Sequence, residues 1–493
     1  MTRFQSFSVR RGQAFRALSG TLLLVTACGQ KPAAIPNSGP SSHQNSDASA
    51  SEQVSLTVYN TNFGLVREVR KVHLGTGNVE LSYADVSAHI QPETVHLKSL
   101  TGDDSLTVLE QNYRYDLLSP DTLLKKSVGK TIKVYCYNEH TGVDEVKQAE
   151  VLSVEGGTVL KIDGQVTSNF TGRFAFPEVP ENLVQKPTLV WLVASAAADQ
   201  RVEVAYLTQG LDWHADYVLS IAADDKLGDL NGWVTLKNET GTSYQNAELK
   251  LVAGDVQRLV PAQPPVMMDS AAPMAAPAPP PPQFKEEGLF EYHLYTLDRP
   301  TSLLNKEQKQ VSLLSAANIA LDKKLIFFGQ QSWFRGNFGQ IVQNQKVSAY
   351  LDVQNKEQNH LGMPLPKGTV RVYKTDTSGQ KQFIGEDAID HTPRDEKIRI
   401  KLGEAFDVVA DRSETDFRVL GTCGSESAWE IKLRNHKDTP ESVEVNEPTG
   451  GDWEILSSSL PATRKDSKTF TFDLRLAPRS ETKLTYRVRV RWC

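Results

Sequence analysis

The sequence predicts an all-β protein made of several β-sandwich modules with few short helices. Three observations predict this fold. Apolar and polar residues alternate along most of the chain, which is the pattern of half-buried strands. Turn signals rich in glycine, asparagine and aspartate separate these runs. The chain has 493 residues, 39% of them hydrophobic. This length is enough for about two to four domains, each with its own core.

The start of the chain has the order of a secretory signal peptide. Basic residues come first, a short apolar stretch follows, and small residues precede Cys28. The run Val25-Thr26-Ala27-Cys28 resembles the bacterial lipobox, in which the cysteine becomes the lipidated N-terminus. The sequence therefore predicts a signal peptide over residues 1–27 and lipidation of Cys28. The alternative is an ordinary secreted protein in which Cys28 lies near the cleavage site by chance.

Residues 28–53 are expected to form a disordered tether, because the polar and proline-rich composition cannot bury a core. The apolar part of the signal is too short for a membrane-spanning helix, which needs about 20 apolar residues. Lipid is therefore the expected attachment to a membrane. Gly29, in place of aspartate, favours the outer membrane by resemblance to proteobacterial sorting.

An N-terminal β domain is predicted over 54–188, beginning where Val54, Leu56 and Val58 alternate with polar residues. Residues 150–162 predict a β-hairpin, because two strand-like runs flank a Gly-Gly pair that supplies positive φ values. Residues 119–126 predict a short helix, with Ser119 as its cap and Pro120 in its first turn.

A second β region is predicted over 189–493. A Pro/Ala-rich segment at 260–283 interrupts it and is expected to be a linker, because consecutive prolines cannot pair in a sheet. A docking peptide for a partner module is the alternative there. The last strand places apolar residues from Leu484 to Trp492 on one face and a basic row from Lys483 to Arg491 on the other. A solvated face is the preferred interpretation of that row over contact with lipid head groups or an acidic partner.

Two runs in this second region resemble a known bacterial family. The first spans 211–217 and contains Trp213 and Tyr217, and the second spans 230–241 and ends in a turn from Asn238 to Gly241. They resemble the domain of unknown function 4139, which is also found in mucoidy-inhibitor-like proteins. The resemblance covers about residues 190–493 and implies an all-β region without an established activity. The expected modules are immunoglobulin- or fibronectin-like sandwiches. Tyr244 stands where the family usually has tryptophan.

The best candidate for chemistry is the set Asp212, His214 and Asp216. Alternate residues of a strand share a face, so these side chains are expected to lie together, opposite Trp213. Carboxylate and imidazole groups at this spacing can orient a general base or hold a divalent metal. One strand rarely completes a metal shell, so an exposed polar strand face is the preferred interpretation, and no metal or other cofactor is predicted. His391 is likewise interpreted as part of an ordinary charged loop.

The cysteines, the net charge and the absence of known catalytic motifs from the sequence limit which classes of function fit this chain. Cys423 and Cys493 lie in the same final region, where they can pair in an oxidising compartment, and Cys136 is expected to be a lone thiol. The net charge of −6 argues against nucleic acid as a partner. No nucleophile elbow, zinc-binding helix motif, phosphate loop or dinucleotide fingerprint occurs in the sequence.

Three functional hypotheses follow. The preferred one is a lipid-anchored protein of the bacterial cell envelope that binds or scaffolds an envelope protein partner and is not an enzyme. The alternative is a periplasmic or surface hydrolase, assisted by a metal, that uses Asp212, His214 and Asp216. The third, ligand capture for an exporter or importer, predicts one large apolar pocket.

Overall fold

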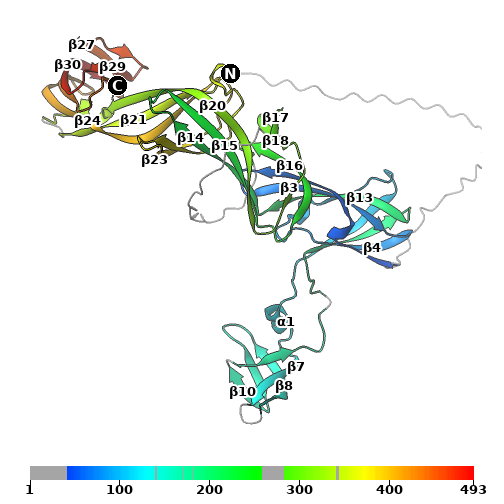
Figure 1. Ribbon diagram of the computed structural model, residues 1–493. Coiled ribbons are helices and arrows are strands. Elements are labelled where there is room, and N and C mark those ends of the chain that lie inside the picture. Colours follow the sequence, from blue (N-terminus) through cyan, green and yellow to red (C-terminus); the bar gives the residue numbers. More distant parts are fainter. Residues whose placement is uncertain (1–41, 139–141, 169, 181, 258–282, 340–342) are drawn as a thin grey trace, which may run out of the picture. The chain divides into compact units, whose positions relative to one another are not determined.

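The computed structural model describes residues 42–138, 142–168, 170–180, 182–257, 283–339 and 343–493 (Figure 1). Nearly all of its regular structure is β-strand, which confirms the all-β prediction. The predicted signal peptide, Cys28 and nearly all of the segment 260–283 lie outside the described residues. Within the described residues, no helix is both long enough and apolar enough to cross a membrane.

The described strands form four sheets. The four-stranded sheet has the order β1 (Ser42–Ser46), β4 (Gly77–Ala84), β12 (Thr188–Ser195) and β6 (Leu106–Arg114). The five-stranded sheet has the order β10 (Gln165–Ser168), β9 (Val159–Ile162), β8 (Val143–Ser153), β7 (Thr131–Asn138) and β11 (Arg173–Ala175). The eight-stranded sheet has the order β17 (Phe284–Leu289), β18 (Tyr292–Leu297), β16 (Tyr244–Ala253), β2 (Ser51–Tyr59), β3 (Phe63–His73), β13 (Asp199–Gln209) and β5 (His96–Ser99), with β19 (Thr301–Leu303) paired to β16.

The thirteen-stranded sheet has the order β23 (Lys381–Ile389), β22 (Gly368–Thr375), β14 (Leu211–Ile221), β15 (Leu227–Asn238), β20 (Glu307–Phe328), β21 (Gln345–Gln354), β24 (Lys397–Val419), β25 (Gly424–Asn435), β30 (Ser480–Arg491) and β27 (Asp452–Ser458). Three further strands complete it: β26 (Glu441–Pro448), β28 (Thr463–Arg464) and β29 (Thr469–Leu476). The described helical segments are α1 (Pro120–Lys126), η1 (Ala48–Ala50), η2 (Pro92–Thr94), η3 (Gln331–Arg335) and η4 (Glu357–Asn359).

Three separate hydrophobic cores form among these sheets. The first core draws residues from the four-stranded sheet, the eight-stranded sheet and the first strands of the thirteen-stranded sheet, and contains Trp191 and Trp213. The second core belongs to the C-terminal part of the thirteen-stranded sheet and surrounds Trp429. The third core is small and lies between the five-stranded sheet and α1. Strands β20 and β24 contribute buried residues to both the first and the second core.

The structure divides the region expected as one N-terminal domain over 54–188 differently. Residues 124–176 build the third core by themselves. Strands on both sides of this segment, including β4 and β12, share the first core. The expected boundary at 188 falls at the start of β12, which pairs with β4 and β6. Chain order alone did not indicate that a whole module is inserted between two strands of one sheet.

The segment expected as a tether over 28–53 also differs, because it contains β1, η1 and the start of β2. Strand β1 pairs in parallel with β4. The fully buried Arg70 holds β1 in place, because its Nη1 donates to the carbonyl oxygen of Ser46 in β1 at 3.2 Å and to that of Ala84 in β4 at 2.8 Å. Pairing and side-chain hydrogen bonds hold this polar strand, and neither leaves an apolar signal in the sequence.

Two local predictions are confirmed. The helix α1 begins at Pro120, and the hydroxyl of Ser119 accepts a hydrogen bond from the backbone N–H of Thr122. The hairpin forms between β8 and β9, and its loop at 154–158 contains Gly156 and Gly157 with φ values of 71° and 133°. This loop is longer than a two-residue turn. The tight turn follows at residues 163–164, between β9 and β10.

Candidate functional site

The predicted polar row Asp212, His214 and Asp216 lies on strand β14. This strand pairs antiparallel with β15 and parallel with β22. Trp213 and Tyr217 are buried on the opposite face, so the alternation expected from the sequence is confirmed. The imidazole Nε2 of His214 lies 3.2 Å from Oδ2 of Asp216. Two of the three predicted residues therefore interact directly.

Both oxygens of the Asp216 carboxylate have partners among the neighbouring side chains. Its Oδ1 accepts a hydrogen bond from Nη1 of Arg371 at 2.9 Å, and its Oδ2 accepts one from the hydroxyl of Thr235 at 2.7 Å. Burial by itself raises the pKa of Asp216, but hydrogen bonds from His214, Thr235 and Arg371 outweigh it and lower the pKa to about 2. The hydrogen bond to Asp216 in turn raises the pKa of His214.

Asp212 is separate from this pair. Its Oδ1 accepts the backbone N–H of Asn62 at 3.1 Å, and burial raises the pKa of Asp212. In the part of the chain that the structure describes, no group of three or more His, Cys, Asp or Glu residues is placed to hold a metal ion. Because Asp212 binds Asn62 whereas His214 pairs with Asp216, the three predicted residues do not converge on one point as the ligands of a metal centre do. Asp216 links β14 to β15 and β22 through polar contacts, and Asp212 links β14 to the turn between β2 and β3.

His391, which the sequence placed in an ordinary loop, fastens that loop to its surroundings. Its Nδ1 accepts the backbone N–H of Lys367 at 3.2 Å, and the side-chain amide of Asn60 lies 3.2 Å from its Nε2. Burial, followed by the nearby charge of Lys367, lowers the pKa of His391. A neutral ring that binds two neighbouring segments is a structural element of the loop.

The basic row on β30 is largely paired with acidic residues of its own sheet. The pairs are Lys483 with Glu430, Arg487 with Asp416 and Glu426, and Arg489 with Glu426 and Glu454. These pairs leave little net positive charge along the row for lipid head groups or an acidic partner. The preferred interpretation, a solvated polar face, agrees with this arrangement.

The structure joins Cys423 and Cys493 in a disulfide, with their Cα atoms 5.6 Å apart. The bond links the turn between β24 and β25 to the C-terminal residue. Cys136 is a free, half-buried thiol in β7. This arrangement leaves Cys28, outside the described residues, as the cysteine that the lipidation hypothesis requires.

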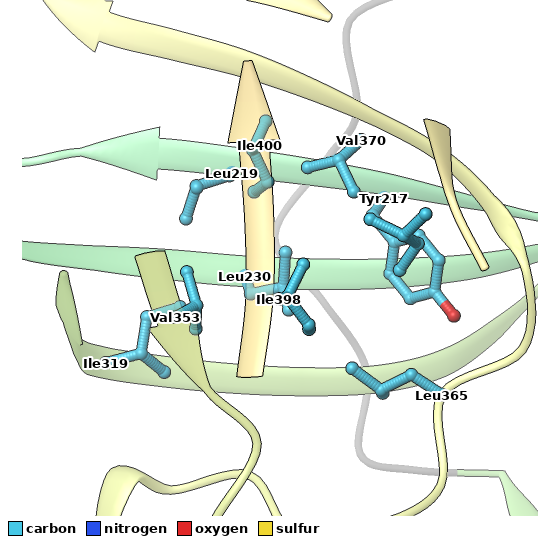
Figure 2. Close-up of a pocket in the computed structure, with 10 residues that line it drawn as sticks. Tyr217, Leu219, Leu230, Ile319, Val353, Leu365, Val370, Ile398 and Ile400 are labelled. Atoms are coloured by element: carbon cyan, nitrogen blue, oxygen red, sulfur yellow. The ribbon is translucent and has the colours of Figure 1, made fainter. Parts of the chain in front are cut away.

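A small apolar cavity lies within the first core. Figure 2 shows side chains from β14, β15, β20, β21, β22 and β24 pointing toward a common centre, among them Tyr217, Ile319 and Ile400. The cavity holds about 10 Å³, which is near the minimum for one water molecule. This space is a packing gap in a β core. It does not supply the large apolar pocket that ligand capture requires.

A larger hollow lies on the outer face of strands β20, β21 and β24, and its volume is about 640 Å³. We call it the polar groove. Strand pairing aligns Asp322, Asp352 and Arg399 across the three strands, and it places Gln354 next to Lys397. Ala320 also lines the hollow. The groove is open to solvent, and its lining is largely polar.

Asp352 organises the floor of the polar groove. Its side chain is 5% exposed, and it accepts hydrogen bonds from Nε of Arg399 at 2.7 Å, Nη2 of Arg399 at 2.8 Å and Nζ of Lys397 at 3.2 Å. Burial alone raises the pKa of Asp352, but the contacts with Arg399 and Lys397 outweigh it and lower the pKa. The carboxylate of Asp352 therefore fixes both cations at the groove through charge-assisted hydrogen bonds.

The wall of the polar groove is formed by η4 and is held by Asn359. The side-chain nitrogen of Asn359 donates to the carbonyl oxygens of Gln354 at 2.9 Å and Ala320 at 3.3 Å, and its side-chain oxygen accepts the backbone N–H of Ala320. The groove was not predictable from the sequence, although Lys397 and Arg399 alternate along a strand, because their partners are fixed by register across three strands.

No family model matches the sequence, and no curated protein matches it either.

Proposed function

We propose that this chain is a lipid-anchored protein of the bacterial cell envelope that binds or scaffolds another envelope component and has no catalytic role. The observation that carries the envelope location is the disulfide between Cys423 and Cys493, because such bonds form and persist in oxidising compartments outside the cytosol. The lipobox-like run before Cys28 supports attachment through acyl chains. Gly29 favours the outer membrane as the location.

The family that the sequence resembles fits this proposal. Buried Trp213 and Tyr217 share one face of β14, as expected of the first motif of the domain of unknown function 4139. Asn238 supports a tight turn, because its side chain accepts the backbone N–H of Thr240 and donates to the carbonyl of Thr242. These contacts support structural roles for the motif residues. Membership of the family is part of the proposal.

A binding role is favoured over metal-assisted hydrolysis by the contacts of Asp216. A general base works best when its pKa lies near the working pH, whereas hydrogen bonds from His214, Thr235 and Arg371 lower the pKa of Asp216 to about 2. We therefore assign this row to the linking of strands. Metal analysis of the purified protein tests the assignment, and a stoichiometric ion that is lost in the Asp216→Asn variant would favour the hydrolase.

Labelling with radioactive palmitate in a Gram-negative host tests the anchor. The full chain is expected to incorporate label and to sediment with outer membranes. The Cys28→Ala variant is expected to lose both properties, since its attachment site is removed. Cys136→Ser is the matched control, because it removes a different cysteine and leaves the signal intact. Label or membrane sedimentation retained by Cys28→Ala would contradict the anchor.

Cross-linking in cells, followed by mass spectrometry, tests the scaffolding role. The expected result is one envelope partner that is linked reproducibly to the same β module. The Cys28→Ala variant serves as the control, since a released chain loses access to a partner held at the membrane. Capture at background level from the anchored chain would count against scaffolding.

A further inference from the structure

We propose that the polar groove on β20, β21 and β24 binds an acidic sugar, meaning a sugar-sized molecule with one carboxylate or phosphate group. This site goes beyond the envelope role and does not depend on the lipid anchor. Its volume of about 640 Å³ lies within the usual range of small-molecule sites, roughly 300–1,000 Å³. The space therefore admits a ligand that is larger than a bare anion.

The charges lining the groove favour an anionic ligand. Each lining carboxylate has a cation partner in the protein: Asp322 with Lys324, Asp352 with Arg399 and Lys397, and Glu444 with Lys465. Lys356 also lines the groove, and its ammonium group has no carboxylate partner among the residues that the structure describes. The protein thus satisfies the negative charges of the groove and leaves positive charge unpaired.

Hydrogen-bond donors also remain for a ligand. Arg399 binds Asp352 through Nε and Nη2, which leaves Nη1 for another acceptor. The side chain of Lys397 is 45% exposed, and its ammonium group carries hydrogens beyond the one that Asp352 accepts. Because Asp352 holds both side chains, little ordering is needed when an oxyanion arrives. Charge-assisted hydrogen bonds to such an oxyanion are among the stronger polar contacts in proteins.

Two amide side chains in the groove suit the hydroxyl groups of a sugar. Gln354 and Gln358 both line the hollow, and neither side-chain amide is hydrogen-bonded within the described ranges. An amide offers both donors and acceptors, which match hydroxyl groups. An apolar ligand would leave these groups and the cations without partners, at a cost in affinity. Donors for one oxyanion beside free amides therefore point to an acidic sugar.

Calorimetric titration of the full purified chain tests this site, with glucuronate and glucose 6-phosphate as probes and glucose as the neutral comparison. We expect at least one acidic probe to bind and glucose not to bind. Lys356→Ala and Lys397→Ala each remove one charged contact, so roughly tenfold weaker binding is expected for each. Lys346→Ala is the matched control, because Lys346 is an exposed lysine on β21 that does not line the groove.

Three outcomes would overturn the assignment. They are no binding of either acidic probe, equal binding of glucose, and equal weakening in the Lys346→Ala control and the groove variants. Thermal melting of each variant shows whether a loss of binding reflects unfolding. The titration does not require lipidation of Cys28, so failure of this proposal and failure of the membrane anchor are separate results.

Discussion

Breaking the buried ion pair between Arg412 and Glu447 is expected to destabilise the second core strongly. Both side chains are 0% exposed, and Arg412 donates two hydrogen bonds to the carboxylate of Glu447, one of them from Nη1 at 3.1 Å. The guanidinium carbon also lies 4.6 Å from the ring centre of Trp333. Removal of one partner leaves a buried charge uncompensated, which costs about 3–5 kcal/mol.

Hydrogen–deuterium exchange in the intact chain measures this cost. Glu447→Gln and Arg412→Met are each expected to lower the protection of β25 by roughly a hundredfold to a thousandfold or more. The double variant Arg412→Met with Glu447→Leu is expected to lose less than the sum, because it buries no unpaired charge. Gly329→Ala is expected to act like a single variant, since its added Cβ would lie 2.0 Å from Oε2 of Glu447.

Peptides of β7 are the internal control, because this strand belongs to the separate third core. Their exchange is expected to stay unchanged in all four variants. The reasoning about the buried pair is refuted if either single variant changes the exchange of β25 by less than about tenfold. Additive losses in the double variant would refute it as well, because they would mean that Arg412 and Glu447 contribute independently.

Three further predictions concern other contacts. Replacing Cys423 and Cys493 by serine removes a bond that closes a loop with a sequence separation of 70. The chain-entropy relation predicts that the free energy of unfolding falls by about 4 kcal/mol. Faster hydrogen–deuterium exchange in β30 measures this loss. NMR titration of His214 is expected to give a raised pKa, because its ring is hydrogen-bonded to Asp216. The charged ring therefore stabilises the fold below about pH 6.5, and this stabilisation is lost as the pH rises through the folded-state pKa. The Asp216→Asn variant is expected to lower the pKa of His214. Arg70→Met removes donors to two carbonyl groups and should expose β1 to exchange, whereas unchanged β1 protection would contradict its fastening role.

The sequence predicted strand faces well, because alternation depends only on neighbours along the chain. Leu484, Tyr486 and Val488 are buried on β30 as expected, and Trp213 and Tyr217 share the buried face of β14. Such side chains must leave water whichever strand lies beside them. The period-2 pattern therefore carries this information without any knowledge of the topology.

Contacts that depend on register were not predictable in the same way. The sequence placed Asp216 and His214 on one face but gave no sign of Arg371, which lies on β22 and arrives through a parallel pairing. The groove residues Asp352 and Arg399 meet because β21 and β24 pair in one particular register. A shift by one residue would send these side chains to the opposite face, and composition does not reveal which register is stable.

The polar networks differ in whether the fold uses up their hydrogen-bonding groups. Arg70 binds Glu68 through two nitrogens and two backbone carbonyls through the third, so all of its nitrogen atoms are engaged. Both carboxylate oxygens of Asp216 likewise have partners within the protein. In the polar groove, by contrast, the buried Asp352 is satisfied while cations and amides around it keep unused donors. Binding of an outside ligand requires such unused groups. Among the three networks compared, the polar groove is the one that keeps them, and this is why we assign the ligand to the groove.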